Sequence, residues 1–339
     1  VYTDGSDVTF NDTNNAHYLV TLNTTVSPHS TTVSNNATAY TISGTGGIAG
    51  TGGLTKSGTG SLTISTVNTY SGNTNVTGGV MTIAAGGSIA SNVVNVASGA
   101  TLNVNGSLSA TAAVTANGPV NFGGTTSNTP LTRTIASLTV APAVTVSITP
   151  STNALTPVTL QTGSLSITGT GKVDVGNNAL IAPGSAASAL TMIQGGQVVS
   201  SSIADSNHAL GYITTGGTNF EIRYTLKGDA NLSGNVDVGD LGALATSYGI
   251  TGGMSWANGD FNQDGTVNVA DLGALATNYG TNLGTSPSLG GGGLSAAEPL
   301  AQAASSGGSA AVPEPTSLGL LSVAAVGLMG RRRRRSASK

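Results

Sequence analysis

Residues 52–83 read GGLTKSGTGSLTISTVNTYSGNTNVTGGVMTI, and apolar side chains alternate there with Ser, Thr and Asn. Alternation with a period of two is typical of a β-strand that has one buried face. Ile83 follows Ile64 by 19 residues, and Val104 follows Ile83 by 21 residues. This regular interval indicates stacked coils of a right-handed parallel β-helix, in which no single coil is large enough to be stable alone.

Comparable alternating segments recur through residues 1–225, separated by turns rich in Gly, Asn and Ser. They lie at residues 8–10, 61–65, 79–84, 100–106, 137–141, 143–149 and 164–175. Gly and Asn supply the positive φ angles that the corners of such coils require. We therefore expect a mainly β chain with a parallel β-helix over residues 1–225. A β-sandwich built from the same strands is the competing architecture, and disorder is disfavoured by the abundance of Val, Ile and Thr.

The composition limits both the core and the possible functions. The chain has 339 residues, of which 50 are Gly, 4% are aromatic and 7% are charged. This suits a thin repetitive core better than one thick core. The absence of cysteine excludes disulfides, thiol catalysis and Cys-based zinc sites. Nucleic-acid binding is not expected, because residues 1–311 hold thirteen acidic side chains against five basic ones.

The same stretch at 52–83 resembles the passenger-associated repeat of bacterial autotransporter-like adhesins. Its parts are a Lys-containing strand at 54–57, a Gly turn at 58–60, a strand at 61–65, an Asn-Thr-Tyr-Ser-Gly corner at 68–72 and a strand at 76–83. The resemblance implies an extended cell-surface β-helix. It does not imply autotransport, because no run of alternating strands typical of a C-terminal β-barrel follows.

Two copies of one Asp-rich pattern follow the β-helix, GDANLSGNVDVGDLGALATSYG at 228–249 and GDFNQDGTVNVADLGALATNYG at 259–280. No basic residue lies within 228–280, so a bound cation is expected to offset the repulsion between the carboxylates. Read as twelve-residue loops, both copies place oxygen at positions 1, 3, 5, 7, 9 and 12, the spacing of a calcium loop. The predicted ligands of two Ca²⁺ ions are Asp229, Asn231, Ser233, the carbonyl of Asn235, Asp237, Asp240, Asp260, Asn262, Asp264, the carbonyl of Thr266, Asn268 and Asp271.

Each loop has Gly at position 6, Gly234 or Gly265, and is followed by a predicted helix that stops at Gly249 or Gly280. Paired loop-then-helix units without an entering helix resemble type I dockerins, which are small calcium modules that bind cohesins. The resemblance covers 228–280. It implies that loop positions 10 and 11 face a cohesin-like partner. These positions are Val238, Gly239, Val269 and Ala270, without the hydroxyl groups common in cellulosomal dockerins.

The chain ends in VPEP, an apolar stretch at 316–330 and RRRRR, which closely resembles the PEP-CTERM sorting signal of Gram-negative bacteria. The matching residues are Val312, Pro313, Glu314, Pro315, Arg331, Arg332, Arg333, Arg334 and Arg335. The resemblance implies transient insertion of a C-terminal hydrophobic helix in the inner membrane, with the arginines cytoplasmic. An exosortase then cuts the chain and releases it to the cell surface or extracellular matrix. A permanent membrane anchor is the alternative.

The predicted domains are therefore a β-helix at 1–225, a dockerin-like calcium module at 226–281, a Gly/Ser/Ala linker at 282–311 and a sorting signal at 312–339. The three signatures together resemble modular surface proteins of planctomycete-type bacteria. We expect an exported, non-catalytic adhesive or structural protein, with exopolysaccharide as a further possible partner.

The alternative is a polysaccharide-degrading β-helix enzyme, or the stalk of an enzyme whose catalytic domain precedes this chain. The first residue is Val1 rather than Met, so we expect that a signal peptide was removed or that the chain is a fragment of a longer protein. The abrupt start favours the fragment.

Overall fold

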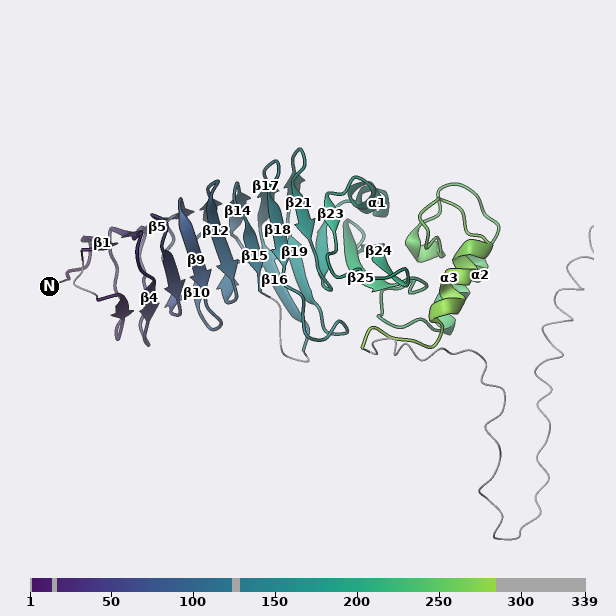
Figure 1. The fold of residues 1–339 in the computed structure, drawn as a ribbon, viewed down its shortest axis with the longest axis horizontal. Coiled ribbons are helices and arrows are strands. Elements are labelled where there is room, and N and C mark those ends of the chain that lie inside the picture. The colour runs from purple at the N-terminus through teal and green to yellow at the C-terminus, as the bar shows by residue number, and fades with distance from the viewer. Residues whose placement is uncertain (1, 14–16, 124–128, 285–339) are drawn as a thin grey trace, which may run out of the picture. The chain divides into compact units, whose positions relative to one another are not determined.

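The structure is a computed structural model that describes residues 2–13, 17–123 and 129–284. These residues form a parallel β-solenoid of about eight turns that ends in an antiparallel hairpin and a small helical module (Figure 1). The parallel pairing of strands far apart in the sequence excludes the β-sandwich alternative, whose sheets are antiparallel. The predicted parallel solenoid is confirmed.

Two long parallel sheets make two faces of the solenoid. The first contains, in order, β1 (Asp7–Asn11), β3 (Ser30–Ser34), β5 (Gly53–Ser57), β8 (Thr74–Val76), β11 (Val93–Val96), β14 (Ala113–Ala116), β17 (Ser137–Val140) and β20 (Leu165–Ile167). The second contains β2 (Leu19–Thr21), β4 (Tyr40–Ser43), β6 (Ser61–Ile64), β9 (Gly79–Ile83), β12 (Ala100–Val104), β15 (Val120–Phe122), β18 (Thr145–Ile148), β21 (Lys172–Asp174) and β23 (Val198–Val199).

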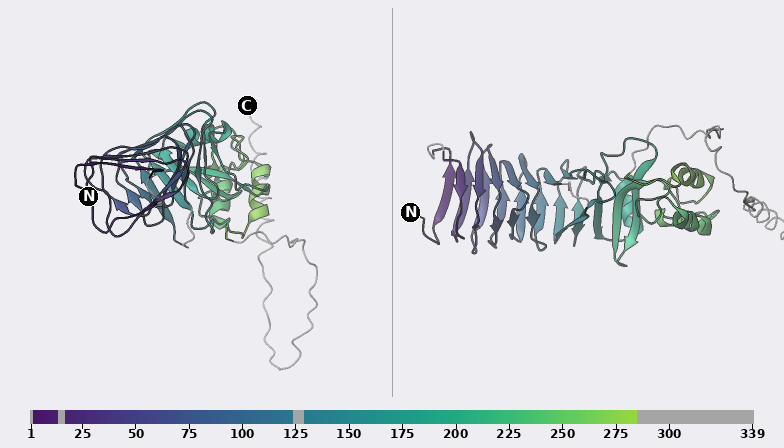
Figure 2. Two further views of the ribbon diagram at one scale, coloured as in Figure 1. Left: turned by 60° about the vertical axis from the view of Figure 1, so that its left-hand side comes forward. Right: turned by 90° about the horizontal axis from the view of Figure 1, so that it is seen from below.

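A third face is divided into two sheets. The shorter sheet contains β13 (Ser107–Leu108), β10 (Ser88–Ile89) and β7 (Val67–Asn68). The longer one contains β16 (Leu131–Ile135), β19 (Val158–Thr162), β22 (Ala179–Pro183), β25 (Asn219–Leu226) and β24 (His208–Thr215). Its last two pairings are antiparallel, so the parallel stacking stops at β22. Figure 2 shows the coils in succession and the hairpin at their C-terminal end.

The core is a set of ladders in which each coil places an apolar side chain above the one before. In the second sheet Ile64 pairs with Ile83, and Val104 pairs with both Ile83 and Phe122. The spacing read from the sequence therefore corresponds to direct register partners. All four side chains are at most 1% exposed. Burial of this kind stabilises by about 25 cal/mol for each Å² of apolar surface removed from water.

The motif residues of the 52–83 stretch have buried polar roles. Asn68 is 1% exposed, its Oδ1 accepts from the Ile48 amide at 2.9 Å, and its Nδ2 donates to the carbonyls of Thr66 at 2.9 Å and Ser88 at 3.0 Å. Because Ile48, Thr66 and Ser88 belong to successive coils, this one amide ties the corner together. The Asn of the motif is thus explained by hydrogen bonding within and between coils.

The described residues contain four helical segments, all of them after β22. They are α1 (Ala186–Gln194), α2 (Val238–Ser247), the 3₁₀ helix η1 (Trp256–Asn258) and α3 (Val269–Asn278). Helix α1 packs on β24 and β25, whereas α2 and α3 contact each other and belong to the helical module. The predicted C-terminal hydrophobic helix lies outside the described residues, as does most of the predicted linker. Within the described residues no helix is long and apolar enough to cross a membrane.

Candidate functional site

The two Asp-rich loops, residues 229–240 (loop 1) and 260–271 (loop 2), form the candidate site. Loop 1 follows β25 directly, and loop 2 follows η1. Each loop runs into a helix whose first turn it caps, α2 for loop 1 and α3 for loop 2. The sequence repeat therefore folds into two copies of one loop-then-helix unit, as predicted from the shared spacing.

The carboxylates at position 1 are buried and face their own loop. Asp229 and Asp260 are both 0% exposed. In loop 1, the Asp229 carboxylate accepts from the amides of Ser233 and Gly234, both at 2.9 Å. In loop 2, the Asp260 carboxylate accepts from the equivalent amides at 3.1 and 2.8 Å. The same contacts recur in both copies, so the loop geometry follows from the repeated sequence.

The carboxylates at position 12 close each loop and cap its helix. Asp240 and Asp271 are also 0% exposed. Asp240 accepts from the Ala230 amide at 2.9 Å with one oxygen and from the Asp237 amide at 2.9 Å with the other. Asp271 makes the same pair of contacts with the loop 2 amides, each at 2.9 Å. A capping box of this kind satisfies amides that the first helical turn leaves free.

The remaining predicted ligands lie nearer the surface. Asn231 and Asn262 each accept from the amide two residues later, at 2.9 and 3.0 Å. Asp237 and Asn268 are the N-caps of α2 and α3. Ser233 and Asp264 are exposed at position 5, and position 7 would contribute the backbone carbonyls of Asn235 and Thr266. Within the described residues, no three Asp, Glu or His side chains come close enough together to hold a metal by themselves.

The backbone of the two loops is bent at matching points. Gly234 and Gly265 at position 6 have φ values of +85° and +83°, as the predicted sharp turn requires. Leu232 and Gln263 at position 4 have φ values of +57° and +64°, a region that non-Gly residues rarely adopt. Such strain at the same position of both copies is typical of a functional loop.

The valines at position 8, Val236 and Val267, are buried, and their backbones bond to the other repeat. Val236 exchanges backbone hydrogen bonds with Gly280 and Thr281, which follow α3, at 2.8 and 3.1 Å. Val267 bonds in the same way to Gly249 and Ile250, which follow α2, at 2.8 and 3.2 Å. Each loop is therefore tied to the end of the other repeat's helix, which makes the two repeats one structural unit.

The electrostatics of the loops fit a hard cation. Burial raises the pKa of the Asp229, Asp240 and Asp260 carboxyls, against backbone hydrogen bonds that lower it. The ion pairs among the described residues are His29–Asp7 and His208–Asp205, both outside the loops. Each loop thus holds two fully buried carboxylates without a basic partner, and its side-chain donors are all oxygen atoms. This donor chemistry fits Ca²⁺.

Several residues outside the predicted ligand set contact the loops. The Thr225 hydroxyl donates to Asp229, and the Trp256 indole Nε1 donates to the Asp229 carbonyl at 2.6 Å. The Arg223 guanidinium donates to the Leu232 carbonyl at 2.8 Å. Trp256 could have been singled out from the sequence, because it is the single tryptophan of the chain. The contacts of Thr225 and Arg223 depend on the fold.

Two cavities in the described part of the solenoid have no carboxylate side chain in their linings. A cavity of about 450 Å³ lies between β13 and β16 and includes Arg133, whose Nη2 donates to the carbonyls of Asn105 and Gly123, both at 3.1 Å. A cavity of about 280 Å³ in the first coils is lined mainly by apolar side chains. Glycoside hydrolysis ordinarily needs two facing carboxylates, and neither lining contains one.

Comparison with known proteins identifies two parts of the chain. Residues 311–335 match the family model of the PEP-CTERM protein-sorting motif, so the predicted sorting signal is confirmed at the level of the motif, although it lies outside the described residues. The chain is also 36% identical over 113 residues to the adhesin BmaC autotransporter of Brucella suis biovar 1 (strain 1330). That match covers 32% of this chain and 3% of the adhesin. No solved structure matches.

Proposed function

We propose that the chain is an exported, non-catalytic surface or matrix protein, in which an adhesive β-solenoid carries a dockerin-like module that binds two calcium ions. The sorting motif and the match to an autotransporter adhesin point to a protein exported to the cell surface. The motif implies sorting by an exosortase. The parallel solenoid supports an adhesive or structural role, since long stacked faces provide extended binding surfaces.

One observation supports calcium binding above all others. Two loops of different sequence hold their first and last carboxylates fully buried, in the same pattern of hydrogen bonds and without a basic partner. Isolated buried carboxylates are costly, and a bound cation removes that cost. Asp229, Asn231, Ser233, Asp237 and Asp240 would hold one ion with the Asn235 carbonyl. The equivalent atoms of loop 2 would hold the second.

A cohesin-like protein is a further proposed partner. Val238 and Val269, at position 10 of the two loops, are each 71% exposed. Tyr248 and Tyr279, at the ends of the two helices, are each 50% exposed. The module therefore presents the same apolar side chains twice, which suits a protein partner better than a polar glycan. Exopolysaccharide remains a proposed ligand for the solenoid faces, where Ser, Thr and Asn predominate.

Calorimetric titration of the whole protein with CaCl₂, after treatment with a chelator, tests calcium binding. We expect saturable uptake of two ions by the wild-type chain and of one ion by Asp229→Asn or Asp260→Asn, because each substitution removes a charge from one loop. Asp4→Asn, which changes an exposed carboxylate outside the module, is the matched control and keeps both ions. A wild-type chain that takes up no calcium would refute the proposal.

A further inference from the structure

We propose that the helical module is the C-terminal cap of the solenoid, so that calcium in the loops stabilises the last solenoid strands as well as the module. This inference rests on the calcium binding proposed above. It goes beyond the predicted division into a β-helix at 1–225 and a module at 226–281, because it assigns the module a structural role in the solenoid itself.

The solenoid needs a cap at this end. On the third face parallel stacking stops at β22, and the antiparallel β24–β25 hairpin is added to the edge of that sheet. The end coil of a solenoid otherwise exposes its core and its unpaired strand edge. In Figure 1 the helical module follows directly beyond this hairpin, and η1 contacts β24. The module is therefore placed where a cap is required.

Trp256 makes an apolar contact between the module and the hairpin. It is 0% exposed, and its ring packs edge-on against Phe261 with centroids 5.2 Å apart. Both Trp256 and Leu232 lie over Gly211 of β24. A Cβ atom at position 211 would lie 2.8 Å from the indole and 2.5 Å from Leu232 Cδ2. The glycine thus permits loop 1 and η1 to lie directly on the strand.

Polar contacts join both repeats to the hairpin. In loop 1, Asp229 accepts from Thr225 of β25, which is fully buried. In loop 2, Gln263 donates to the Leu210 carbonyl of β24 at 3.2 Å. The first ligand residue of loop 1 and the strained fourth residue of loop 2 are therefore both bonded to the last solenoid strands.

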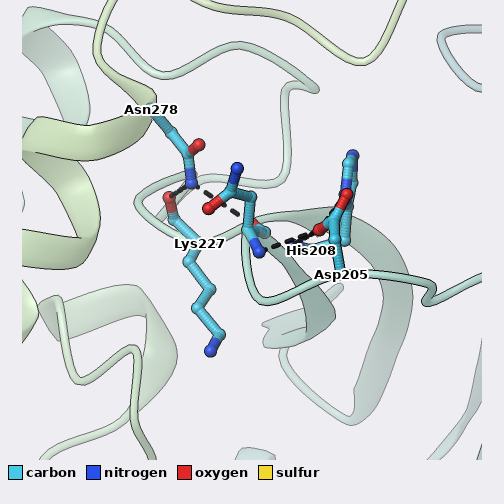
Figure 3. A network of polar contacts seen from close by, with 5 residues as sticks. Asp205, His208, Lys227 and Asn278 are labelled. Carbon is cyan, nitrogen blue, oxygen red and sulfur yellow. Dashed lines mark hydrogen bonds and ion pairs between the residues drawn. The ribbon is translucent and has the colours of Figure 1, made fainter. Parts of the chain in front are cut away.

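Asn278 provides a third polar connection, at the end of α3 (Figure 3). Its Nδ2 donates to the Lys227 carbonyl at 2.7 Å and to the Asn207 carbonyl at 3.2 Å. Nearby, the Asp205 carboxylate accepts from the amides of Asn207 and His208 at 2.8 and 3.0 Å. The segment that leads into β24 is therefore held by its own Asp205 and, through Asn278, by the module.

These contacts place the calcium loops and the hairpin in one cooperative unit. A ligand that binds only the folded form of a unit lowers the equilibrium constant for opening of that whole unit. The reduction is about a hundredfold when the free ligand concentration is 100 times its Kd. Calcium would therefore protect amides in the hairpin that lie outside the loops. If the module were independent, protection would stop at the loops and their helices.

Hydrogen exchange of the full chain, measured by mass spectrometry with calcium and with chelator, tests this inference. The calorimetric titration is run on the same protein, so that calcium uptake and protection are compared. We expect exchange in peptides from 208–226 to slow by about tenfold or more with calcium, and exchange in the early coils at 30–57 to stay unchanged. Uptake of calcium with protection confined to 229–282 would overturn the inference and leave calcium binding intact. Absence of uptake would overturn both.

Two variants test the route of coupling. Asn278→Ser introduces the residue that α2 carries at the equivalent position, Ser247, and removes the contact with the Lys227 carbonyl. Trp256→Phe removes the indole donor and keeps an aromatic ring. In both variants we expect calcium uptake to persist, while the slowing of hydrogen exchange by calcium in 208–226 falls severalfold. Thr277→Ser changes the exposed neighbour of Asn278 and is the control, which should behave as wild type. Undiminished protection in both variants would contradict the proposed contacts.

Discussion

The side chain of Lys56 lies inside the solenoid, at the register position that Val33 and Val76 occupy in the neighbouring coils. It is 0% exposed. Its ammonium donates to the carbonyls of Ser57, Gly58 and Gly78 at 2.7, 3.0 and 3.2 Å. A cation in an apolar ladder is tolerated here because backbone carbonyls surround it, and hydrogen bonds to a charged group are the stronger kind.

Substitution of Lys56 should destabilise the solenoid in a manner that depends on pH. Lys56→Met leaves buried carbonyls without this donor, at a cost of about 1–3 kcal/mol. Burial also lowers the pKa of Lys56 from 10.5, with the Asp12 charge opposing the shift. The folded state therefore releases this proton at lower pH than the unfolded chain does, so wild-type stability rises as pH approaches 10.5 from below.

Urea unfolding at about pH 8 and about pH 10 measures this effect. The difference in the free energy of unfolding between wild type and Lys56→Met should be larger at the higher pH. Lys172→Met, which changes an exposed lysine, is the control and should show no such increase. A difference that is equal at both pH values would contradict a shifted pKa at Lys56.

At the scale of elements, two glycines of the module should respond in opposite ways to alanine. Gly242 lies on the exposed side of α2, and a Cβ there meets nothing within 4 Å, so Gly242→Ala should stabilise the helix by about 0.5–1 kcal/mol. Gly234 has φ +85° in loop 1, and a Cβ there lies 3.0 Å from Leu155 Cδ2, so Gly234→Ala should destabilise by about 1–2 kcal/mol.

Thermal unfolding followed by helical circular dichroism, with calcium present, compares the two variants. The opposite signs are what matters, because both variants add the same methyl group to the same module. Equal shifts of the melting temperature in the two variants would contradict the positive φ of Gly234 in loop 1 and the exposed helical position of Gly242 in α2.

The elements differ in how far the sequence predicts them. The strands were predictable because alternation and coil spacing are local patterns, and Ile64, Ile83 and Val104 became register partners as expected. Helix α1 was not predicted, because Ser185 pairs with Ser188 in its capping box and the helix has no acidic first turn or basic last turn. The docking of Trp256 on Gly211 joins residues 45 positions apart and leaves no periodic signal.

At the scale of the whole molecule, charge is concentrated in two places. Six of the fourteen acidic residues lie within 228–280, and six of the eleven basic residues lie within 331–339. Neutral side chains make many of the contacts between coils, as where Asn95 donates to Asn75 and Asn121 donates to Asn103, both at 2.9 Å. Among the described residues the coils are therefore joined by few ion pairs, such as His29–Asp7, and most of the charge is left for the proposed cation binding and for sorting.

The sorting motif should determine whether the mature protein retains its arginines. A helix of the fifteen mostly apolar residues at 316–330 would rise about 22 Å, which is shorter than the roughly 30 Å hydrocarbon core, and the arginines that follow would hold the cytoplasmic side. Such a marginal span suits transient retention before cleavage better than permanent anchoring. In a host that carries an exosortase, the mature wild-type chain should therefore lack residues 331–335.

Replacement of Pro313, Glu314 and Pro315 by alanine should block cleavage and keep the protein in the membrane fraction, as shown by the mass of its C-terminal peptide. Glu298→Ala with Pro299→Ala alters a second Glu-Pro pair of the same chain and is the matched control, which should be cleaved as wild type is. A surface-exposed wild-type protein that keeps all five arginines would show permanent anchoring instead. Loss of cleavage in the control as well would show that the cut depends on the chain before the motif.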